Sequence, residues 1–187
     1  MRPVLLTRHG ETAWNALGRL QGHTDVELND VGRAQARVLA ASLGARDVAC
    51  VWTSDLSRAR ETGAIVAAAL GLTAPRIDPE LRERNFGVFE GLTRDEIVSQ
   101  HPEAWRAWRE HTTGPPGAEP RDAAVARLTR ALTRLAAEDG GPVLAISHGG
   151  VMRLWLMEVL GATIPLVANG ATYVVEHDGG AFRARVR

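Results

Sequence analysis

Residues 4–12 read VLLTRHGET, an apolar run that passes directly into a cluster of polar and charged residues. A continuous apolar run of this length is typical of a parallel strand that is covered on both faces. Two further runs share the pattern: residues 48–53 lead into SDLSR, and residues 143–146 lead into SHGG. The sequence therefore predicts three buried strands whose carboxyl ends all carry polar side chains.

Patterns typical of amphipathic helices separate these runs. The first helix is expected between the candidate N-cap Asn29 and Gly44. Its predicted apolar face consists of Val31, Ala34, Val38 and Ala41. Further helices are expected over residues 56–70, 125–135 and 151–160. Strands that alternate with helices predict an α/β fold, here a doubly wound, mostly parallel sheet with helices on both faces.

Two segments depart from this alternation. Residues 172–176 and 182–186 flank an Asp-Gly-Gly turn, which predicts a C-terminal hairpin. Residues 81–120, which we call the excursion, show no strand pattern, and such a long excursion from an α/β domain is typical of a lid or binding loop. We expect one domain over residues 1–187, with this lid.

The excursion contains Trp105 and Trp108, which would share one face of a helix because they are three residues apart. Two interpretations are open for this pair. Both side chains could pack the lid onto the sheet, or one could touch an aromatic or sugar-like group of a substrate.

The composition excludes several classes of protein. Twenty-two basic residues balance twenty-two acidic ones, so no net field attracts nucleic acid or an anionic membrane. All the basic residues are arginine, which excludes Schiff-base lysine chemistry and a P-loop lysine. The single Cys50 excludes an intramolecular disulfide and a Cys-rich zinc site. With no apolar run near the ~20 residues of a membrane span, we expect a cytoplasmic protein.

Ligands of open α/β sheets bind beyond the carboxyl ends of the strands. Arg8 and His9 follow the first run, Arg58 the second and His148 the third, so we expect them to meet at one sheet edge. Zinc is disfavoured there, because the arginines would repel a cation and neither histidine lies in an HExxH motif. Arginine side chains and helix N-termini suit a phosphate group, and a neutral histidine nitrogen can accept a phosphoryl group. We expect neither a metal nor a cofactor.

Five ordered motifs resemble those of the histidine phosphatase superfamily, also called the phosphoglycerate mutase-like family. A lone RHG tripeptide would be weak, but these motifs occur in the family's order over most of residues 4–150. They are LTRHGET at 6–12 with Asn15, the stretch from Gln21-Gly22 to Ala36, SDLSRARET at 54–62, LRE at 81–83 with Phe86-Gly87 and Glu90-Gly91, and SHGG at 147–150.

The resemblance implies a role for each matching residue. His9 would accept the phosphoryl group, and Glu83 would protonate the leaving oxygen and later activate water. The phosphoryl oxygens would be surrounded by Arg8, Arg58 and His148. The pocket would be lined further by Asn15, Gln21, Gly22 and Gly149. We expect the two arginines and a charged His148 to supply the positive field that a metal would otherwise provide. We also expect Arg58 to face a water-filled pocket.

A carboxyl group that works as an acid near neutral pH must be partly desolvated. We therefore expect Glu83 to be withdrawn from water and its neighbours Arg82 and Arg84 to point away from the pocket. If Glu83 is not the proton shuttle, Glu90 is the nearest alternative in the sequence.

The family contains both phosphatases and mutases. Mutases are typically larger between the acidic residue and the second histidine, so the short segment 84–147 favours a phosphatase that acts on a small phosphomonoester. A phosphoglycerate mutase-type phosphotransferase is the alternative. A catalytically degenerate phosphate-binding protein is disfavoured because every expected catalytic position is filled. A nucleotide-binding protein is disfavoured because GxGxxG and P-loop motifs are absent.

One segment departs from the pattern of the family's phosphatases. Residues 115–120 read PPGAEP, where those enzymes have Pro-Pro-Gly-Gly-Glu-Ser. Ala118 replaces a glycine, and Pro120 replaces the serine that would cap the next helix. The resemblance therefore leaves open where that helix starts, the geometry of the lid and the fine specificity.

Overall fold

The computed structural model describes residues 1–44, 47–110 and 112–187. Its strands are β1 Val4–Arg8, β2 Cys50–Thr53, β3 Arg76–Ile77, β4 Val143–Ser147, β5 Thr172–His177 and β6 Phe182–Val186. Its α-helices are α1 Ala13–Ala16, α2 Asp30–Ser42, α3 Ser57–Ala69, α4 Arg94–Gln100, α5 Pro102–Arg109, α6 Arg121–Ala137 and α7 Gly149–Leu160. Two short 3-10 helices, η1 Pro79–Leu81 and η2 Gly87–Phe89, lie between β3 and α4.

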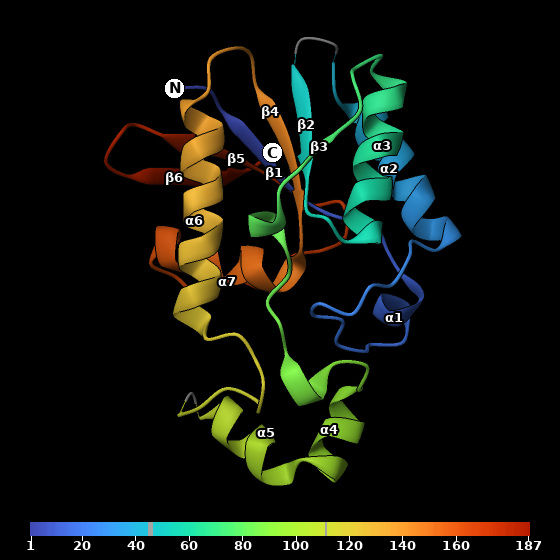
Figure 1. The fold of residues 1–187 in the computed structure, drawn as a ribbon, viewed down its shortest axis with the longest axis vertical. Coiled ribbons are helices and arrows are strands. Elements are labelled where there is room, and N and C mark those ends of the chain that lie inside the picture. Colours follow the sequence, from blue (N-terminus) through green and yellow to red (C-terminus); the bar gives the residue numbers. More distant parts are fainter. Residues whose placement is uncertain (45–46, 111) are drawn as a thin grey trace.

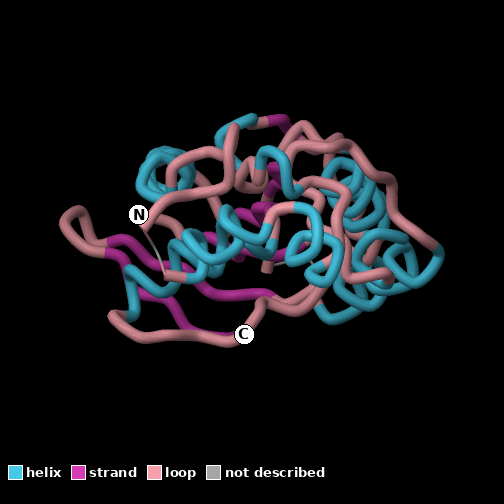
Figure 2. The backbone as a smooth tube through the Cα atoms, turned by 90° about the horizontal axis from the view of Figure 1, so that it is seen from below, coloured by secondary structure: helices cyan, strands magenta, loops and turns pink. Residues whose placement is uncertain are grey.

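The six strands form one sheet in the order β3-β2-β4-β1-β5-β6 (Figure 1). The first four are parallel, and β1 pairs with β4 from Val4↔Val143 to Arg8↔Ser147. β5 runs antiparallel to β1 and continues into β6 as the predicted hairpin, which projects at one edge of the molecule (Figure 2). The predicted α/β class and the mostly parallel sheet are confirmed.

Helices cover both faces of the sheet, as predicted. Alternate residues of the central strands point to opposite sides, since Val4 and Leu6 belong to one buried cluster and Leu5 to another. The first cluster is completed by α6 and α7, and the second by α2 and α3. This alternation places the two long apolar strands, β1 and β4, in the middle of the molecule.

The predicted apolar face of α2 is wrong. Val31 and Val38 are 52% and 70% exposed, and the residues that α2 buries are Gly32, Ala36, Leu39 and Ala40. Gly32 decides the orientation, because a Cβ there would overlap the backbone of Glu11. Close backbone contact at a glycine therefore turns the more apolar branched side chains outward.

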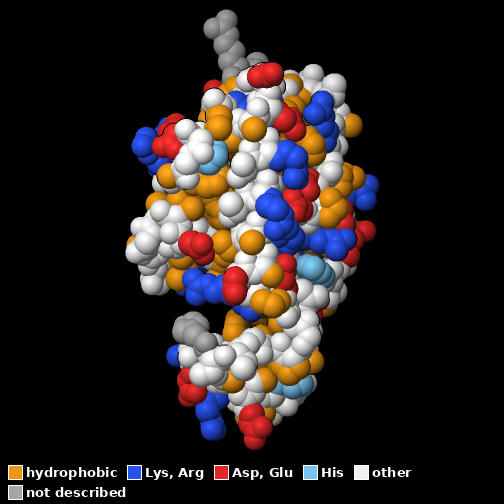
Figure 3. All heavy atoms as spheres, turned by 60° about the vertical axis from the view of Figure 1, so that its left-hand side comes forward, with side chains coloured by type: hydrophobic (Ala, Val, Ile, Leu, Met, Phe, Trp, Pro, Cys, Tyr) orange, Lys and Arg blue, Asp and Glu red, His pale blue; other side chains and the backbone are white. Residues whose placement is uncertain are grey.

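The excursion is helical and has a small core of its own. It holds η2, α4 and α5 below the sheet in Figure 1, and its buried residues Phe86, Phe89 and Ile97 pack with Trp105 and Trp108. The two indole rings are 5.4 Å apart between centroids. Neither tryptophan packs onto the sheet, which corrects the first of the two interpretations above. In Figure 3 this part forms a lower lobe that is joined to the body by a narrow waist.

Smaller differences concern the ends of elements. α7 begins at Gly149, two residues before the predicted start, and the two-residue strand β3 has no counterpart among the predictions. α6 starts after Pro120, which occupies the N-cap position and makes no side-chain hydrogen bond there. Within the described residues, we find no helix long and apolar enough to cross a membrane.

Candidate active site

The carboxyl ends of β1 and β4 bring the two predicted histidines together. His9 directly follows β1, and its backbone N–H donates to the Ser147 carbonyl (3.0 Å). His148 follows β4 and is the N-cap residue of α7. Both side chains are buried, and their ring centroids are 4.9 Å apart. The parallel pairing of β1 with β4 is thus what joins residues that lie far apart in the sequence.

The surroundings of His9 favour its neutral form. Burial lowers its pKa well below the usual value, and the nearby Arg58 and Arg8 guanidinium groups lower it further. Nδ1 lies 2.6 Å from the Gly10 carbonyl oxygen. Only a protonated Nδ1 can donate this bond, so Nε2 carries the free lone pair. A neutral imidazole with a free Nε2 is the protonation state that a nucleophile needs.

His148 is held from both sides of its ring. Arg58 Nε donates to His148 Nδ1 (3.3 Å), and His148 Nε2 lies 2.7 Å from Ser54 Oγ. Because Nδ1 must accept, Nε2 carries the proton and donates to the serine. Burial, with Arg58 and His9 beside it, lowers the pKa of His148 well below its usual value. The expectation of a charged His148 is therefore wrong for this structure.

Arg58 is fully buried. The prediction that it faces a water-filled pocket is therefore wrong. Besides His148, its guanidinium donates to the carbonyls of Gly22 (2.8 Å) and Thr24 (2.9 Å). Burial lowers its pKa to about 10. The expectation overlooked that the first turn of α3 faces into the protein. Arg58 is thus both a positive charge beside the histidines and a brace for the loop at residues 22–24.

Arg8 lies at the end of β1 and keeps a hydrogen-bond donor free. Its Nη1 donates to the Val167 carbonyl (2.6 Å), while its buried Nε has no partner among the residues that the structure describes. A buried N–H without a partner is costly unless a ligand satisfies it. Burial lowers the pKa of Arg8, which nevertheless stays a cation at neutral pH.

The loop after β1 supplies the amide side chains of the site. Asn15 Oδ1 accepts from the Thr12 backbone N–H (3.2 Å) as part of the capping box of α1. The same oxygen accepts from Asn169 Nδ2 (3.3 Å), which also donates to the His9 carbonyl (3.0 Å). The buried Gln21 accepts from Thr12 Oγ1 (3.0 Å). These contacts fix the loop against the end of β1.

Gly22 and Glu90 connect this loop to the excursion. Gly22 has a positive φ of 53°, and a Cβ there would overlap the Glu90 carboxylate. Glu90 accepts hydrogen bonds from the backbone N–H groups of His23 (3.0 Å), Thr24 (2.9 Å) and Phe86 (3.0 Å). Its carboxylate thus anchors the loop at residues 22–24 to the excursion.

Glu83 lies at the start of the excursion and points at the N-terminus of α7. Its carboxylate accepts from the backbone N–H groups of Gly150 (2.8 Å), Val151 (2.7 Å) and Arg84 (2.8 Å). Only 8% of the residue is exposed, in accord with the predicted withdrawal from water. Gly149, the first residue of α7, lies in the chain between His148 and Gly150, whose N–H binds this carboxylate.

The arginines that flank Glu83 turn to other partners, as expected. Arg82 Nε donates to the Asp55 carboxylate (2.6 Å), and Arg84 Nε donates to the Glu119 carbonyl (2.8 Å). Neither guanidinium bonds to the Glu83 carboxylate within the part of the chain that the structure describes.

Sequence reasoning missed three contributors to this site. Ser54 sits in the SDLSR motif but was assigned no role, although its position after β2 could have placed it beside His148. Asn169 lies outside every motif, and nothing in the sequence links it to His9. Arg127 reaches the backbone of Glu83 from α6, and only the packing of that helix reveals the contact (3.3 Å).

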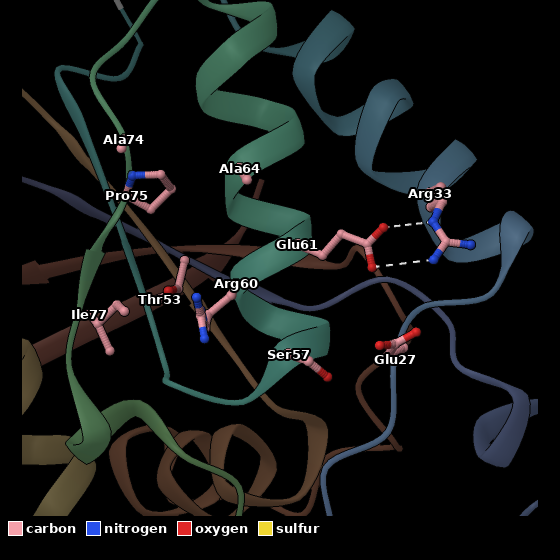
Figure 4. A pocket seen from close by; sticks show the side chains of 10 residues that line it. All are labelled: Glu27, Arg33, Thr53, Ser57, Arg60, Glu61, Ala64, Ala74, Pro75 and Ile77. Carbon is pink, nitrogen blue, oxygen red and sulfur yellow. Dashed lines mark hydrogen bonds and ion pairs between the residues drawn. The ribbon is translucent and has the colours of Figure 1, made fainter.

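A separate cavity of about 680 Å³ lies between α3 and the segment that leads into β3 (Figure 4). Glu61 and Arg33 form an ion pair across one of its walls (2.6 Å). Neither histidine of the site is among its lining residues. We also find no cluster of three or more His, Cys, Asp or Glu side chains suited to a metal ion, over the residues that the structure describes.

Comparisons with known proteins agree with this geometry. A profile of the histidine phosphatase superfamily (branch 1) matches residues 4–187. The chain belongs to the histidine phosphatase superfamily. The family's phosphatases and its mutase-like proteins are both among the relatives of the chain.

Three relatives from the histidine phosphatase superfamily are similar to this chain over most of its length. Phosphoglycerate mutase-like protein 4 of Arabidopsis thaliana is 41% identical over 80% of the chain and 67% of the relative. Glucosyl-3-phosphoglycerate phosphatase of Mycobacterium tuberculosis is 37% identical, over 81% and 72%. Metal-independent phosphoserine phosphatase of Arabidopsis thaliana is 35% identical, over 86% and 69%.

Solved structures of histidine phosphatases show the same fold. Bacillus stearothermophilus YhfR superposes with a TM-score of 0.88 at 31% identity, covering 100% of this chain and 96% of that one. A mycobacterial glucosyl-3-phosphoglycerate phosphatase in complex with VO3 gives a TM-score of 0.85 at 32% identity, with coverages of 100% and 97%.

Proposed function

We propose that the chain is a phosphomonoester hydrolase that works through a phosphohistidine on His9. The observation that carries the proposal is the fixed tautomer of His9, whose Nδ1 is bound to Gly10 O so that Nε2 is free. In the first step, Nε2 attacks phosphorus while the bond from phosphorus to the leaving oxygen breaks. The buried Arg58 and the partly buried Arg8 beside the ring supply the charge that stabilises the phosphoryl oxygens.

Glu83 is the residue we assign to proton transfer. In its acid form it gives its proton to the leaving oxygen, and the resulting carboxylate then takes a proton from water as that water attacks phosphorus. The second step breaks the bond between phosphorus and Nε2 and restores neutral His9. The N-terminus of α7 holds the carboxylate in position through both steps.

The other predicted residues complete the phosphoryl pocket. We assign Arg8 Nε, which has no partner among the described residues, to a phosphoryl oxygen. Arg58 has two N–H groups beyond the three it uses in the contacts above. His148 is neutral here, and a bound phosphoryl dianion would favour its charged form. Asn15, Gln21, Gly22 and Gly149 form the walls.

A phosphatase is favoured over a mutase-type phosphotransferase. Two of the three relatives above carry phosphatase names, one of glucosyl-3-phosphoglycerate and one of phosphoserine. Both names describe small phosphorylated metabolites, and we propose a substrate of that class. The short segment 84–147 supports the same choice, because the family's mutases have additional segments there that close over a second phosphate.

The Glu83→Gln variant tests the assignment of acid and base. On an alkyl phosphate, kcat/KM should fall by about 10²–10⁴-fold, because the amide can neither donate the proton nor act as a base. An aryl phosphate with a good leaving group needs little acid, so its first step should be nearly preserved. The variant should then accumulate acid-labile phosphate on His9. Equal losses on both substrates without trapped phosphoenzyme would remove Glu83 from this role.

Metal independence is the second test. We expect turnover of p-nitrophenyl phosphate to be unchanged by EDTA, because two arginines already provide the positive field. Activity that collapses in EDTA and returns with Mg²⁺ or Zn²⁺ would contradict the mechanism.

A further inference from the structure

Arg127 is an inward-facing arginine on α6 whose guanidinium meets the excursion at both of its ends. Nη1 donates to the carbonyls of Glu80 (2.7 Å) and Arg82 (2.9 Å), and Nη2 donates to the Glu83 carbonyl (3.3 Å). Nε and Nη2 bind the two Glu119 carboxylate oxygens at 3.0 and 2.9 Å. These five contacts match the five N–H groups of a guanidinium.

The backbone around Glu83 depends on such side-chain contacts. Residues 82–85 belong to no helix or strand, so no ladder of backbone hydrogen bonds fixes them. The Glu83 carbonyl is bound by Arg127 on one side and by His23 Nε2 (2.9 Å) on the other. Arg127 therefore takes the place of a neighbouring strand in setting where the Glu83 backbone lies.

Glu119 extends this support to the point where the excursion returns to the body. Its backbone N–H donates to the Asn85 carbonyl (3.0 Å), and its own carbonyl accepts from Arg84 Nε (2.8 Å). The carboxylate that pairs with Arg127 thus belongs to a segment already joined to residues 84 and 85. A single ion pair, with 14% and 18% of the two side chains exposed, links both ends of the excursion to α6.

We propose that Arg127, paired with Glu119, is a positioning residue for the Glu83 carboxyl group. This inference rests on the proposed role of Glu83 as acid and base. A displacement of about 1 Å in a catalytic group costs about 10²-fold in rate. Loss of Arg127 should therefore weaken proton transfer while leaving the hydrogen bonds of His9, His148 and Arg58 in place.

The test compares Arg127→Met and Arg127→Lys with the matched control Arg130→Met. Arg130 lies one turn further along α6 and makes an exposed ion pair with Glu80. The readout is the ratio of kcat/KM on an alkyl phosphate to kcat/KM on p-nitrophenyl phosphate. Arg127→Met should lower this ratio by about 10–100-fold. Arg127→Lys should lower it less, because an ammonium group keeps the charge and some donors although it cannot form the fork. Arg130→Met should leave the ratio unchanged.

Equal losses on both substrates in the Arg127 variants, together with a lower melting temperature, would show that Arg127 is only structural. The Glu119→Gln variant keeps the experiment informative if Arg127→Met fails to fold, and it should lower the same ratio in the same direction.

The Glu83→Gln variant separates failure of this inference from failure of the proposed function. If Glu83→Gln lowers the ratio and Arg127→Met does not, the positioning role alone is wrong. If Glu83→Gln leaves the ratio unchanged, the acid role is wrong and the inference fails with it. When both are right, adding Arg127→Met to Glu83→Gln should lower the ratio no further, because the two changes act on one proton transfer.

Discussion

The carboxyl edge of the sheet and the excursion hold their functional side chains by different means. His9 and His148 come directly after two paired strands, and both are buried beside Arg58 of α3. Glu83 lies on a segment without regular structure, and side chains from α6 and backbone groups of α7 hold it. Damage at the sheet edge should therefore lower global stability, whereas damage in the excursion should first lower activity.

Replacing Arg58 should give the largest effect on stability. Arg58→Ala removes three hydrogen bonds and leaves a buried void, so we expect the free energy of unfolding to fall by about 3–5 kcal/mol. Activity should be lost as well. The control is Arg60→Ala on the exposed side of the same helix, which should change stability by less than about 0.5 kcal/mol. Urea unfolding measures the stability of both variants. An unchanged free energy of unfolding for Arg58→Ala would show that the three hydrogen bonds of Arg58 do not stabilise the fold.

Acid should destabilise the sheet edge before it affects the excursion. The pKa values of His9 and His148 are lowered in the folded state, so the unfolded chain binds protons that the folded chain cannot. The free energy of unfolding should then fall as the pH drops below about 6.5, by up to about 1.4 kcal/mol per pH unit for each histidine. Urea midpoints between pH 7 and 5 measure this slope. The His9→Asn variant should show about half of it, and a flat profile would contradict the lowered pKa values.

Glu90→Gln tests the connection between the two regions. An amide nitrogen would face backbone N–H groups that now bind a carboxylate. We therefore expect the free energy of unfolding to fall by about 1–3 kcal/mol. Burial raises the pKa of Glu90, but its hydrogen bonds to His23, Thr24 and Phe86 outweigh this and lower it overall. The ionised Glu90 carboxylate therefore stabilises the fold near neutral pH, and this stabilisation is lost as the pH falls below about 4.5. The exposed Glu103→Gln on α5 is the control, and thermal melting at pH 7 and pH 4 distinguishes the two.

The smallest effect should come from the start of α6. Pro120 occupies the N-cap position without a side-chain hydrogen bond. Pro120→Ser should add a cap worth about 1 kcal/mol, offset in part by the greater freedom of the unfolded chain. We expect a melting temperature that is unchanged or slightly higher, with kcat/KM unaltered. A clear drop in melting temperature would show that the proline ring itself supports the return of the excursion.

Local patterns in the sequence determined which strands are buried and which residues follow them. The runs at residues 4–6 and 143–146 are apolar throughout because both faces of these strands are covered, and this property is visible without a structure. Since parallel strands end at the same edge, the meeting of His9 with His148 also followed from the sequence. The hairpin at the C-terminus was predicted from its turn residues for the same local reason.

Only the tertiary structure decided the contacts that depend on close approach between distant elements. The burial of Arg58, the neutral state of His148 and the outward face of α2 all result from which surfaces meet, and no periodicity in the sequence specifies that. The same holds for Arg127, since a helix pattern shows that a residue faces inward but not which carbonyl groups it will meet. Apolar periodicity is a property of one element, whereas burial of charge and selection of a tautomer are properties of several elements packed together.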